Sequence, residues 1–129
     1  RETTMILVVD DDEAIVEFLR AALEDCGYRV ETAGNGVQAY EHLKHPDCKG
    51  MLLDINMPKI NGVELLMLMQ ADDIRVPTIV MAGFDDFDEL EMKNFENVVE
   101  FLHKPFELQD LLDRVQTHVL PAARKPQAT

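Results

Sequence analysis

The chain has little of what a disulfide-stapled or membrane-spanning protein needs. Its only two cysteines, Cys26 and Cys48, stand far apart and form no Cys-x-x-Cys pair. No secretory signal opens the sequence, and no apolar run approaches the roughly 20 residues that a membrane-spanning helix requires. We therefore expect a protein of the reducing cytoplasm that has no membrane partner.

Basic residues are also scarce. Twelve lysines and arginines stand against 25 aspartates and glutamates, which gives a net charge of −13 and a pI of about 4.5. Such a charge repels phosphate backbones and anionic lipid surfaces, so direct nucleic-acid binding is not expected. The sequence also lacks internal repeats, low-complexity stretches, and the Gly-x-Gly-x-x-Gly and Gly-x₄-Gly-Lys-Ser/Thr phosphate-binding loops.

The length and composition are those of one globular domain. The chain has 129 residues, of which 47% are hydrophobic and 29% charged, and this is enough to bury a core without disulfides. We expect a domain over residues 1–121. The Ala/Pro-rich basic segment 122–129 is expected to be a tail or the start of a linker, and the opening Arg1 suits a piece of a longer protein.

Hydrophobic periodicity predicts strands that alternate with helices. We expect strands at residues 5–9, 28–32, 50–53, 78–81 and 98–102. We expect a first helix that begins at Asp12 and ends before Gly27, and further helices near residues 37–43, 63–69 and 85–93. The apolar face of a last helix consists of Leu108, Leu111, Leu112, Val115 and Val119. This alternation predicts an α/β fold with a doubly wound five-stranded parallel sheet and five helices. The expected strand order is 2-1-3-4-5, and the site should lie beyond the carboxyl ends of the strands, where that order reverses.

Carboxylates follow the two strands that flank this reversal. Asp10 and Asp11 come at the end of the first strand and Asp54 at the end of the third. Like charges brought this close raise one another's pKa values, and a hard divalent cation with oxygen ligands relieves the repulsion. The sequence therefore predicts a Mg²⁺ site formed by these three aspartates.

A lysine follows the fifth strand at the same edge of the predicted sheet. Lys104 precedes Pro105, and its compact ammonium suits both a carboxylate and an incoming phosphoryl group. The Lys104-Pro105 bond is a candidate cis peptide, which would re-aim the lysine side chain.

Three segments, ILVVDDDE, LLDINMPKINGVELL and FLHKPFELQDLL, resemble the signatures of the response-regulator receiver family over nearly the whole chain. The resemblance implies a flavodoxin-like receiver fold with Mg²⁺ as cofactor. It implies these roles: Asp54 as phosphoacceptor, Asp11 as a direct metal ligand, Asp10 as a support acting largely through water, the Asn56 backbone carbonyl as third protein ligand, Lys104 as partner of the phosphoryl group, and Pro105 as cis.

The same resemblance implies a two-component phosphorelay function. A sensor histidine kinase or phosphotransfer protein would donate the phosphoryl group, and an output domain or effector would read it at the surface of the fourth helix, fifth strand and fifth helix. The domain would then be no enzyme beyond catalysing its own phosphorylation and dephosphorylation. The resemblance leaves a dimer open.

Several positions near the site bear on signalling. Ala82 stands where the family has Thr or Ser, and Phe101 where Tyr is frequent. Losing the hydroxyl predicts weaker phosphoryl stabilisation, by about 1–3 kcal/mol, and weak or rerouted communication to the output surface. Asn56 and Phe84 flank the site and are expected to tune autodephosphorylation, in a direction that the sequence leaves open.

Two other function classes stay open at this point. A phosphorylation-independent interaction module has Ala82 as its only support in the sequence. In a flavodoxin-like cofactor binder, the three carboxylates would repel a flavin phosphate, and no Ser/Thr-rich loop follows the first strand. Five methionines are expected in the core or at its edge: Met51, Met57, Met67, Met69 and Met81. The four histidines are expected at the surface: His42, His45, His103 and His118.

Overall fold

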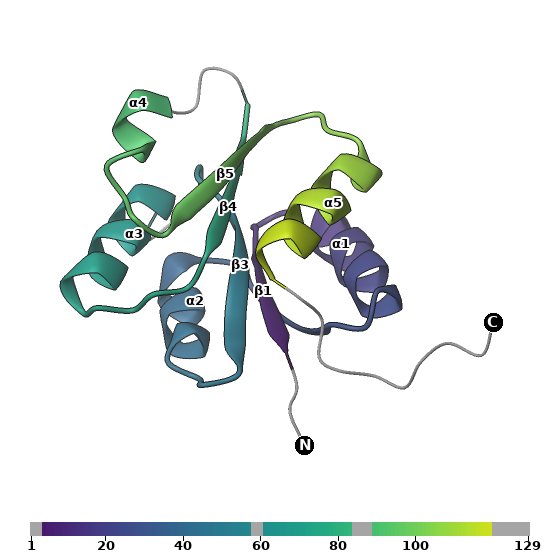
Figure 1. Ribbon diagram of the computed structural model, residues 1–129, viewed down its shortest axis with the longest axis horizontal. Helices are drawn as coiled ribbons and strands as arrows, with labels where there is room; N and C mark the ends of the chain where they lie inside the picture. The colour runs from purple at the N-terminus through teal and green to yellow at the C-terminus, as the bar shows by residue number, and fades with distance from the viewer. Residues whose placement is uncertain (1–3, 58–60, 84–88, 120–129) are drawn as a thin grey trace.

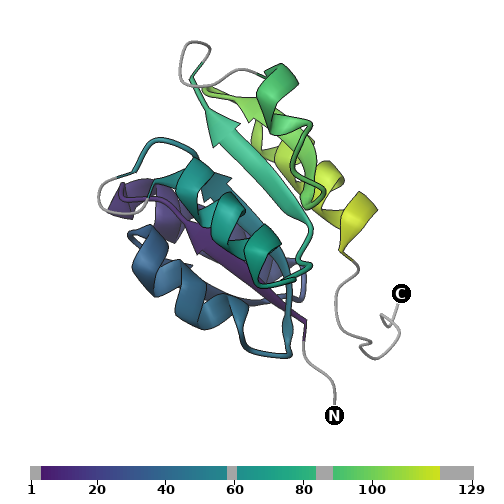
Figure 2. The same cartoon turned by 90° about the vertical axis from the view of Figure 1, so that its left-hand side faces the viewer.

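The fold is a five-stranded parallel sheet between two layers of helices (Figures 1 and 2). The structure, a computed structural model, describes residues 4–57, 61–83 and 89–119. The strands are β1 (Met5–Val9), β2 (Arg29–Ala33), β3 (Cys48–Asp54), β4 (Thr78–Ala82) and β5 (Val98–His103), in the order β2-β1-β3-β4-β5. The predicted strand order is confirmed.

The helices of the described residues divide between the two faces of the sheet. They are α1 (Glu13–Asp25), α2 (Gly36–Leu43), α3 (Gly62–Ala71), the short α4 (Glu89–Met92) and α5 (Leu108–His118). One apolar core joins the sheet to α2, α3 and α4, and the other joins it to α1 and α5. This is the doubly wound arrangement that the alternation of strands and helices predicted.

The continuous apolar run of β1 follows from its position in the middle of the sheet. Met5, Leu7 and Val9 enter the core beneath α2 and α3, whereas Ile6 and Val8 enter the core beneath α1 and α5. All five residues are buried, because a central parallel strand is covered on both faces.

Side-chain caps fix where the helices near the site begin. The Asp12 carboxylate accepts hydrogen bonds from the backbone N–H groups of Ala14 and Ile15 at the start of α1. Asn61 and Glu64 form a reciprocal capping box at the start of α3. Gly27, with φ of 99°, follows the C-cap of α1. These caps place the first residues of α1 and α3 close to the carboxyl edge of the sheet.

The structure corrects some details of the sequence prediction. β2 is shifted by one residue, β3 starts two residues earlier, and the described part of α4 begins at Glu89, with 84–88 outside the described residues. Met67 was predicted to pack in the core or at its edge, and this was wrong, because its side chain is 58% exposed. His118 was predicted at the surface, and its side chain is half-buried beside Glu100. Within the described ranges, no helix is long and apolar enough to cross a membrane.

Candidate functional site

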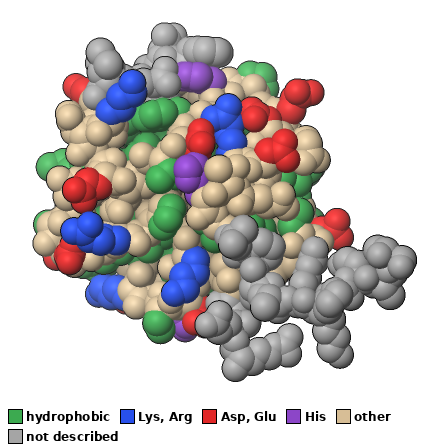
Figure 3. Space-filling model, in the orientation of Figure 1, with side chains coloured by type: hydrophobic (Ala, Val, Ile, Leu, Met, Phe, Trp, Pro, Cys, Tyr) green, Lys and Arg blue, Asp and Glu red, His purple; other side chains and the backbone are tan. Residues whose placement is uncertain are grey.

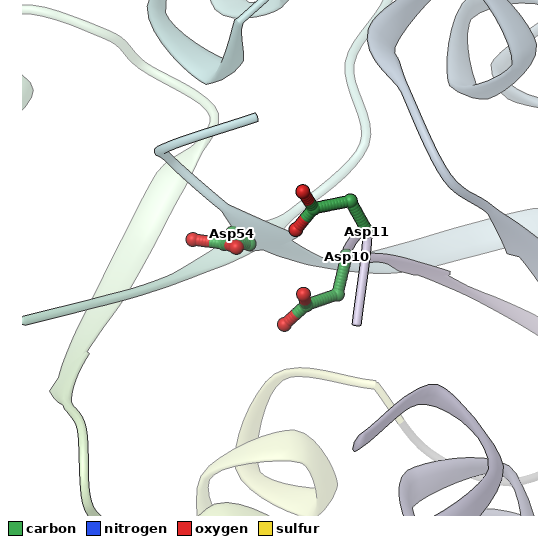
Figure 4. A group of neighbouring side chains, drawn as sticks. All are labelled: Asp10, Asp11 and Asp54. Carbon is green, nitrogen blue, oxygen red and sulfur yellow. The ribbon is translucent and has the colours of Figure 1, made fainter. Parts of the chain in front are cut away.

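Three carboxylates meet at the carboxyl edge of the sheet. β1 and β3 pair in register at Val9 and Leu53, so Asp10 and Asp54, the next residue in each segment, emerge side by side. One oxygen from each of Asp10, Asp11 and Asp54 lies within 4.8 Å of the others. Figure 4 shows the three side chains around one small space. The structure therefore brings together the three aspartates among the four predicted metal ligands.

The two inner carboxylates are buried and held by backbone N–H groups. Asp10 is 2% exposed and Asp54 is 6% exposed, whereas Asp11 is exposed to solvent. The Asp12 N–H donates to Asp10 Oδ1 at 2.9 Å, and the Asn56 N–H donates to Asp54 Oδ1 at 3.2 Å. Each inner carboxylate thus keeps its other oxygen for a cation.

The electrostatics of this edge favour a positive charge. Burial raises the pKa of Asp54 to about 6, the hydrogen bond from the Asn56 N–H opposes this rise, and the negative charge of Asp10 adds to it. A hard divalent ion relieves such crowding of oxygen ligands, and carboxylate oxygens are the donors that Mg²⁺ prefers. The donor set therefore fits a divalent metal ion.

Lys104 reaches the carboxylates from the end of β5. Its Nζ lies 3.1 Å from Asp10 Oδ2 and 3.5 Å from Asp54 Oδ2. Burial lowers the pKa of Lys104, but the hydrogen bond and the negative charge of Asp10, together with Asp54, outweigh it, so the pKa is raised. Lys104 is therefore a cation held between the two buried acids.

The backbone around Lys104 fixes this approach. The Lys104 N–H donates to the Ala82 carbonyl at 2.8 Å, which ties the end of β5 to the end of β4. The peptide bond from Lys104 to Pro105 is cis, as the sequence predicted.

The predicted tuning residues lie around this edge. Ala82 is fully buried at the end of β4 within the core beneath α2, α3 and α4, so the position offers a methyl group and no hydroxyl. Phe101 is half-buried against the same core. Asn56 is exposed and contributes its N–H to Asp54, and Phe84 lies outside the described residues. A role for the Asn56 carbonyl as a metal ligand stays a prediction.

Sequence reasoning missed a charged network between β5 and α5. Glu100 accepts a hydrogen bond at 2.7 Å from the Arg114 guanidinium, and its second oxygen lies 2.7 Å from His118 Nε2. Arg114 and His118 stand four residues apart, hence on one face of α5. That spacing is the signal in the sequence, but only the packing of α5 against β5 shows that Glu100 faces these two residues.

Comparisons with known proteins agree with this arrangement. The family model described as "Response regulator receiver domain" matches residues 6–116. The chain is 35% identical over 111 residues to response regulator MprA of Mycobacterium ulcerans, covering 86% of this chain and 48% of that protein. It is 34% identical over 111 residues to MprA of Mycobacterium leprae, covering 86% of this chain and 49% of that protein. The chain therefore spans about half the length of these curated relatives.

Solved structures share the fold. Chemotaxis protein CheY4 of Vibrio cholerae superposes with a TM-score of 0.78 and 26% identity, over 90% of this chain and 98% of that one. The receiver domain of sensor histidine kinase PA1611 from Pseudomonas aeruginosa PAO1, with a magnesium ion in its active-site cleft, has a TM-score of 0.78 and 24% identity, over 90% and 97%. The second likeness bears on the fold alone.

Proposed function

The chain belongs to the response regulator receiver domain family, and from this premise we propose that Asp54 accepts a phosphoryl group from the phosphohistidine of a sensor histidine kinase or phosphotransfer protein. The observation that carries the proposal is the meeting of Asp10, Asp11 and Asp54 beside Lys104 at one edge of the sheet. The domain acts in signalling, and residues 1–121 form its receiver unit.

The transfer needs a carboxylate nucleophile and positive charge around the phosphorus. An oxygen of Asp54 attacks the phosphorus, a P–O bond forms, the P–N bond of the phosphohistidine breaks, and the released imidazole takes up a proton. The Lys104 ammonium, 3.5 Å from Asp54 Oδ2, is close enough to pair with the incoming phosphoryl oxygens. Later attack by water on the phosphorus breaks the bond to Asp54 and releases phosphate, which resets the domain.

Mg²⁺ is the proposed cofactor, held by Asp10, Asp11 and Asp54 and by the Asn56 backbone carbonyl. When bound, it supplies positive charge that offsets the carboxylates and the phosphoryl oxygens. The magnesium ion in the receiver domain of PA1611 supports this choice, as does the oxygen-only donor set. Asn56 and Phe84 then tune the access of water to the acyl phosphate.

The dependence on Mg²⁺ gives the direct test of this function. Purified protein incubated with acetyl phosphate and Mg²⁺ should gain the mass of one phosphoryl group. Adding EDTA first should prevent the gain, because Lys104 alone then has to offset the charge of the three carboxylates and of the phosphoryl oxygens. Intact-protein mass spectrometry measures both. No gain with acetyl phosphate or a phosphorylated histidine kinase would instead favour the phosphorylation-independent interaction module, which Ala82 alone supports.

The output face is proposed to be α4, β5 and α5, read in the cytoplasm by an output domain, an effector or a second copy. The Glu100–Arg114–His118 network lies on this face and joins β5 to α5 through side-chain contacts. Because Ala82 offers no hydroxyl to the phosphoryl group, we propose that phosphorylation is communicated weakly to this face, or by another route.

Ala82→Thr should lengthen the lifetime of the phosphorylated state. A hydroxyl at the end of β4 adds one charge-assisted hydrogen bond of about 1–3 kcal/mol, which corresponds to roughly five-fold or more in lifetime. Ala82→Val is the matched control, because valine has the shape of threonine without its hydroxyl and crowds the same fully buried position. Loss of radiolabelled phosphate over time measures the lifetime. Equal lifetimes in the Thr and Val variants would show that the hydroxyl has no part in the site.

A further inference from the structure

The helix α3 is apolar on two sides. Of its ten residues, GVELLMLMQA, only Glu64 and Gln70 are polar. One stripe is buried against the sheet and consists of Leu65, Leu66 and Met69. A second stripe, Glu64, Met67, Leu68 and Ala71, lines a shallow hollow of about 400 Å³ on the solvent side. We call these four residues the outer α3 stripe.

The exposure of the outer α3 stripe is unusual for a surface helix, which ordinarily turns a polar face to water. Met67 is 58% exposed and Leu68 is 37% exposed. They are adjacent, whereas Phe18 and Val37, the other large exposed hydrophobic residues of the described part, lie on α1 and α2. At the left-hand edge of Figure 3, where Figure 1 places α3, small areas of green hydrophobic surface lie between red and blue side chains. Covering adjacent apolar side chains of this kind stabilises a complex.

The spacing within the stripe indicates the shape of what would cover it. Its apolar members, Met67, Leu68 and Ala71, lie together on one face of α3, and Glu64 stands one turn before them on that face. An apolar strip of this kind is the surface that one helix presents to another. Recognition of this type lays the apolar face of an amphipathic helix into an apolar groove. A helix is therefore the occupant that matches the stripe.

The surrounding charge indicates the chemistry of that helix. α3 carries no lysine or arginine, Glu64 lines the hollow, and Asp72 follows its last turn, whereas the next acid, Asp73, is paired with Arg75 at 2.9 Å. The negative end of the helix dipole adds to these acids. A second copy of this chain would bring acid against acid and a net charge of −13 against the same charge. A partner rich in lysine and arginine is complementary.

We propose that the outer α3 stripe binds an amphipathic helix of another protein, whose apolar seam is flanked by lysine and arginine. This surface is separate from the aspartate cluster, so the inference does not depend on phosphoryl transfer to Asp54. Binding to this surface and phosphorylation are measured independently of each other.

Two synthetic helical peptides test the proposal on the full chain. Both carry leucine at i, i+3, i+4 and i+7, one has lysine on the flanks, and the other has glutamate there. The lysine peptide should give saturable amide NMR shift changes centred on Gly62–Ala71, with an affinity that falls as salt rises. The glutamate peptide should not bind. Fluorescence anisotropy gives the dissociation constants.

Substitutions then identify the stripe itself. Met67→Glu should weaken binding of the lysine peptide about tenfold or more, because the complex loses the apolar contact of the methionine and must bury a carboxylate against the leucine seam, which outweighs the attraction of that carboxylate for the lysine flanks. Glu64→Gln keeps the capping box, since glutamine serves in it, and should weaken binding by about two- to threefold through lost charge. Phe18→Gln, which removes an exposed hydrophobic residue of α1, should change nothing.

The proposal is overturned by any of three results: no saturable binding of the lysine peptide at millimolar concentration, equal binding of both peptides, or shift changes centred away from α3. A dimer of the chain that Met67→Glu dissociates would also overturn it, by assigning the stripe to a second copy. If the NMR spectrum of Met67→Glu shows that this variant is unfolded, Glu64→Gln takes its place in the test. Weaker binding of the lysine peptide by Glu64→Gln then supports the proposal, and unchanged binding contradicts it.

Discussion

Replacing Asp54 by asparagine is expected to abolish phosphorylation and, in the metal-free protein, to raise the melting temperature. The amide cannot act as the nucleophile, so the mass gain with acetyl phosphate and Mg²⁺ should disappear. The fold should persist, because an asparagine oxygen can still accept the hydrogen bond from the Asn56 N–H and Lys104 keeps its contact with Asp10 at 3.1 Å.

The stability gain follows from the pKa of Asp54. Burial raises this pKa from 3.8 to about 6 in the folded protein, so the folded state holds its proton more tightly than the unfolded state does. The charged carboxylate therefore costs stability that grows as the pH rises from about 4 to about 6 and stays constant above, up to about 3 kcal/mol. At neutral pH with EDTA, Asp54→Asn should melt several degrees higher, whereas near pH 4 the difference should vanish.

Asp11→Asn is the matched control for the melting measurement. Asp11 belongs to the same cluster but is exposed, so water already solvates its charge and its removal should leave the metal-free melting temperature nearly unchanged. Its Mg²⁺ affinity should fall all the same. If Asp54→Asn kept the mass gain, the phosphoacceptor would lie elsewhere. A lower melting temperature at neutral pH would contradict the assigned cost of burying the charge.

The aspartate cluster was predictable because strand ends are readable in the sequence. A buried parallel strand is a continuous apolar run, so the first polar residue after it marks the carboxyl edge of the sheet. Asp10 and Asp54 each stand at such an end, and the predicted strand order made β1 and β3 neighbours. Lys104 was placed at this edge because it follows the end of the predicted fifth strand.

The sequence could not show which face of a helix packs on the sheet, or how far apart two side chains lie. The pattern of α3 is apolar nearly all round, so periodicity does not separate the face that packs on the sheet from the face that Met67 exposes. The pairing of Glu100 with His118 needs the crossing of α5 over β5. Likewise, sequence order gives no distances, and the contact of Lys104 with Asp10 is shorter than its contact with Asp54.

Lys104→Met is expected to separate phosphoryl transfer from metal binding. Methionine keeps much of the length and packing of lysine but removes the charge that would pair with the phosphoryl oxygens. Losing one such positioned group typically costs about 10²–10³ in rate, so the rate of phosphorylation by acetyl phosphate should fall by that order. Mg²⁺ affinity should stay the same or tighten, because the ammonium that now contacts Asp10 and Asp54 competes with the metal ion for the same carboxylate oxygens.

Lys104→Arg keeps the charge in this experiment but presents it as a planar fork. It should recover part of the rate, since the phosphoryl oxygens regain a cation, and its Mg²⁺ affinity should lie below that of Lys104→Met. Titration calorimetry gives the affinities, and the time course of the mass gain gives the rates. A Met variant that lost Mg²⁺ binding together with phosphorylation would mean that Lys104 holds the carboxylates in place, because a group that acts only on the phosphoryl oxygens leaves the metal site intact.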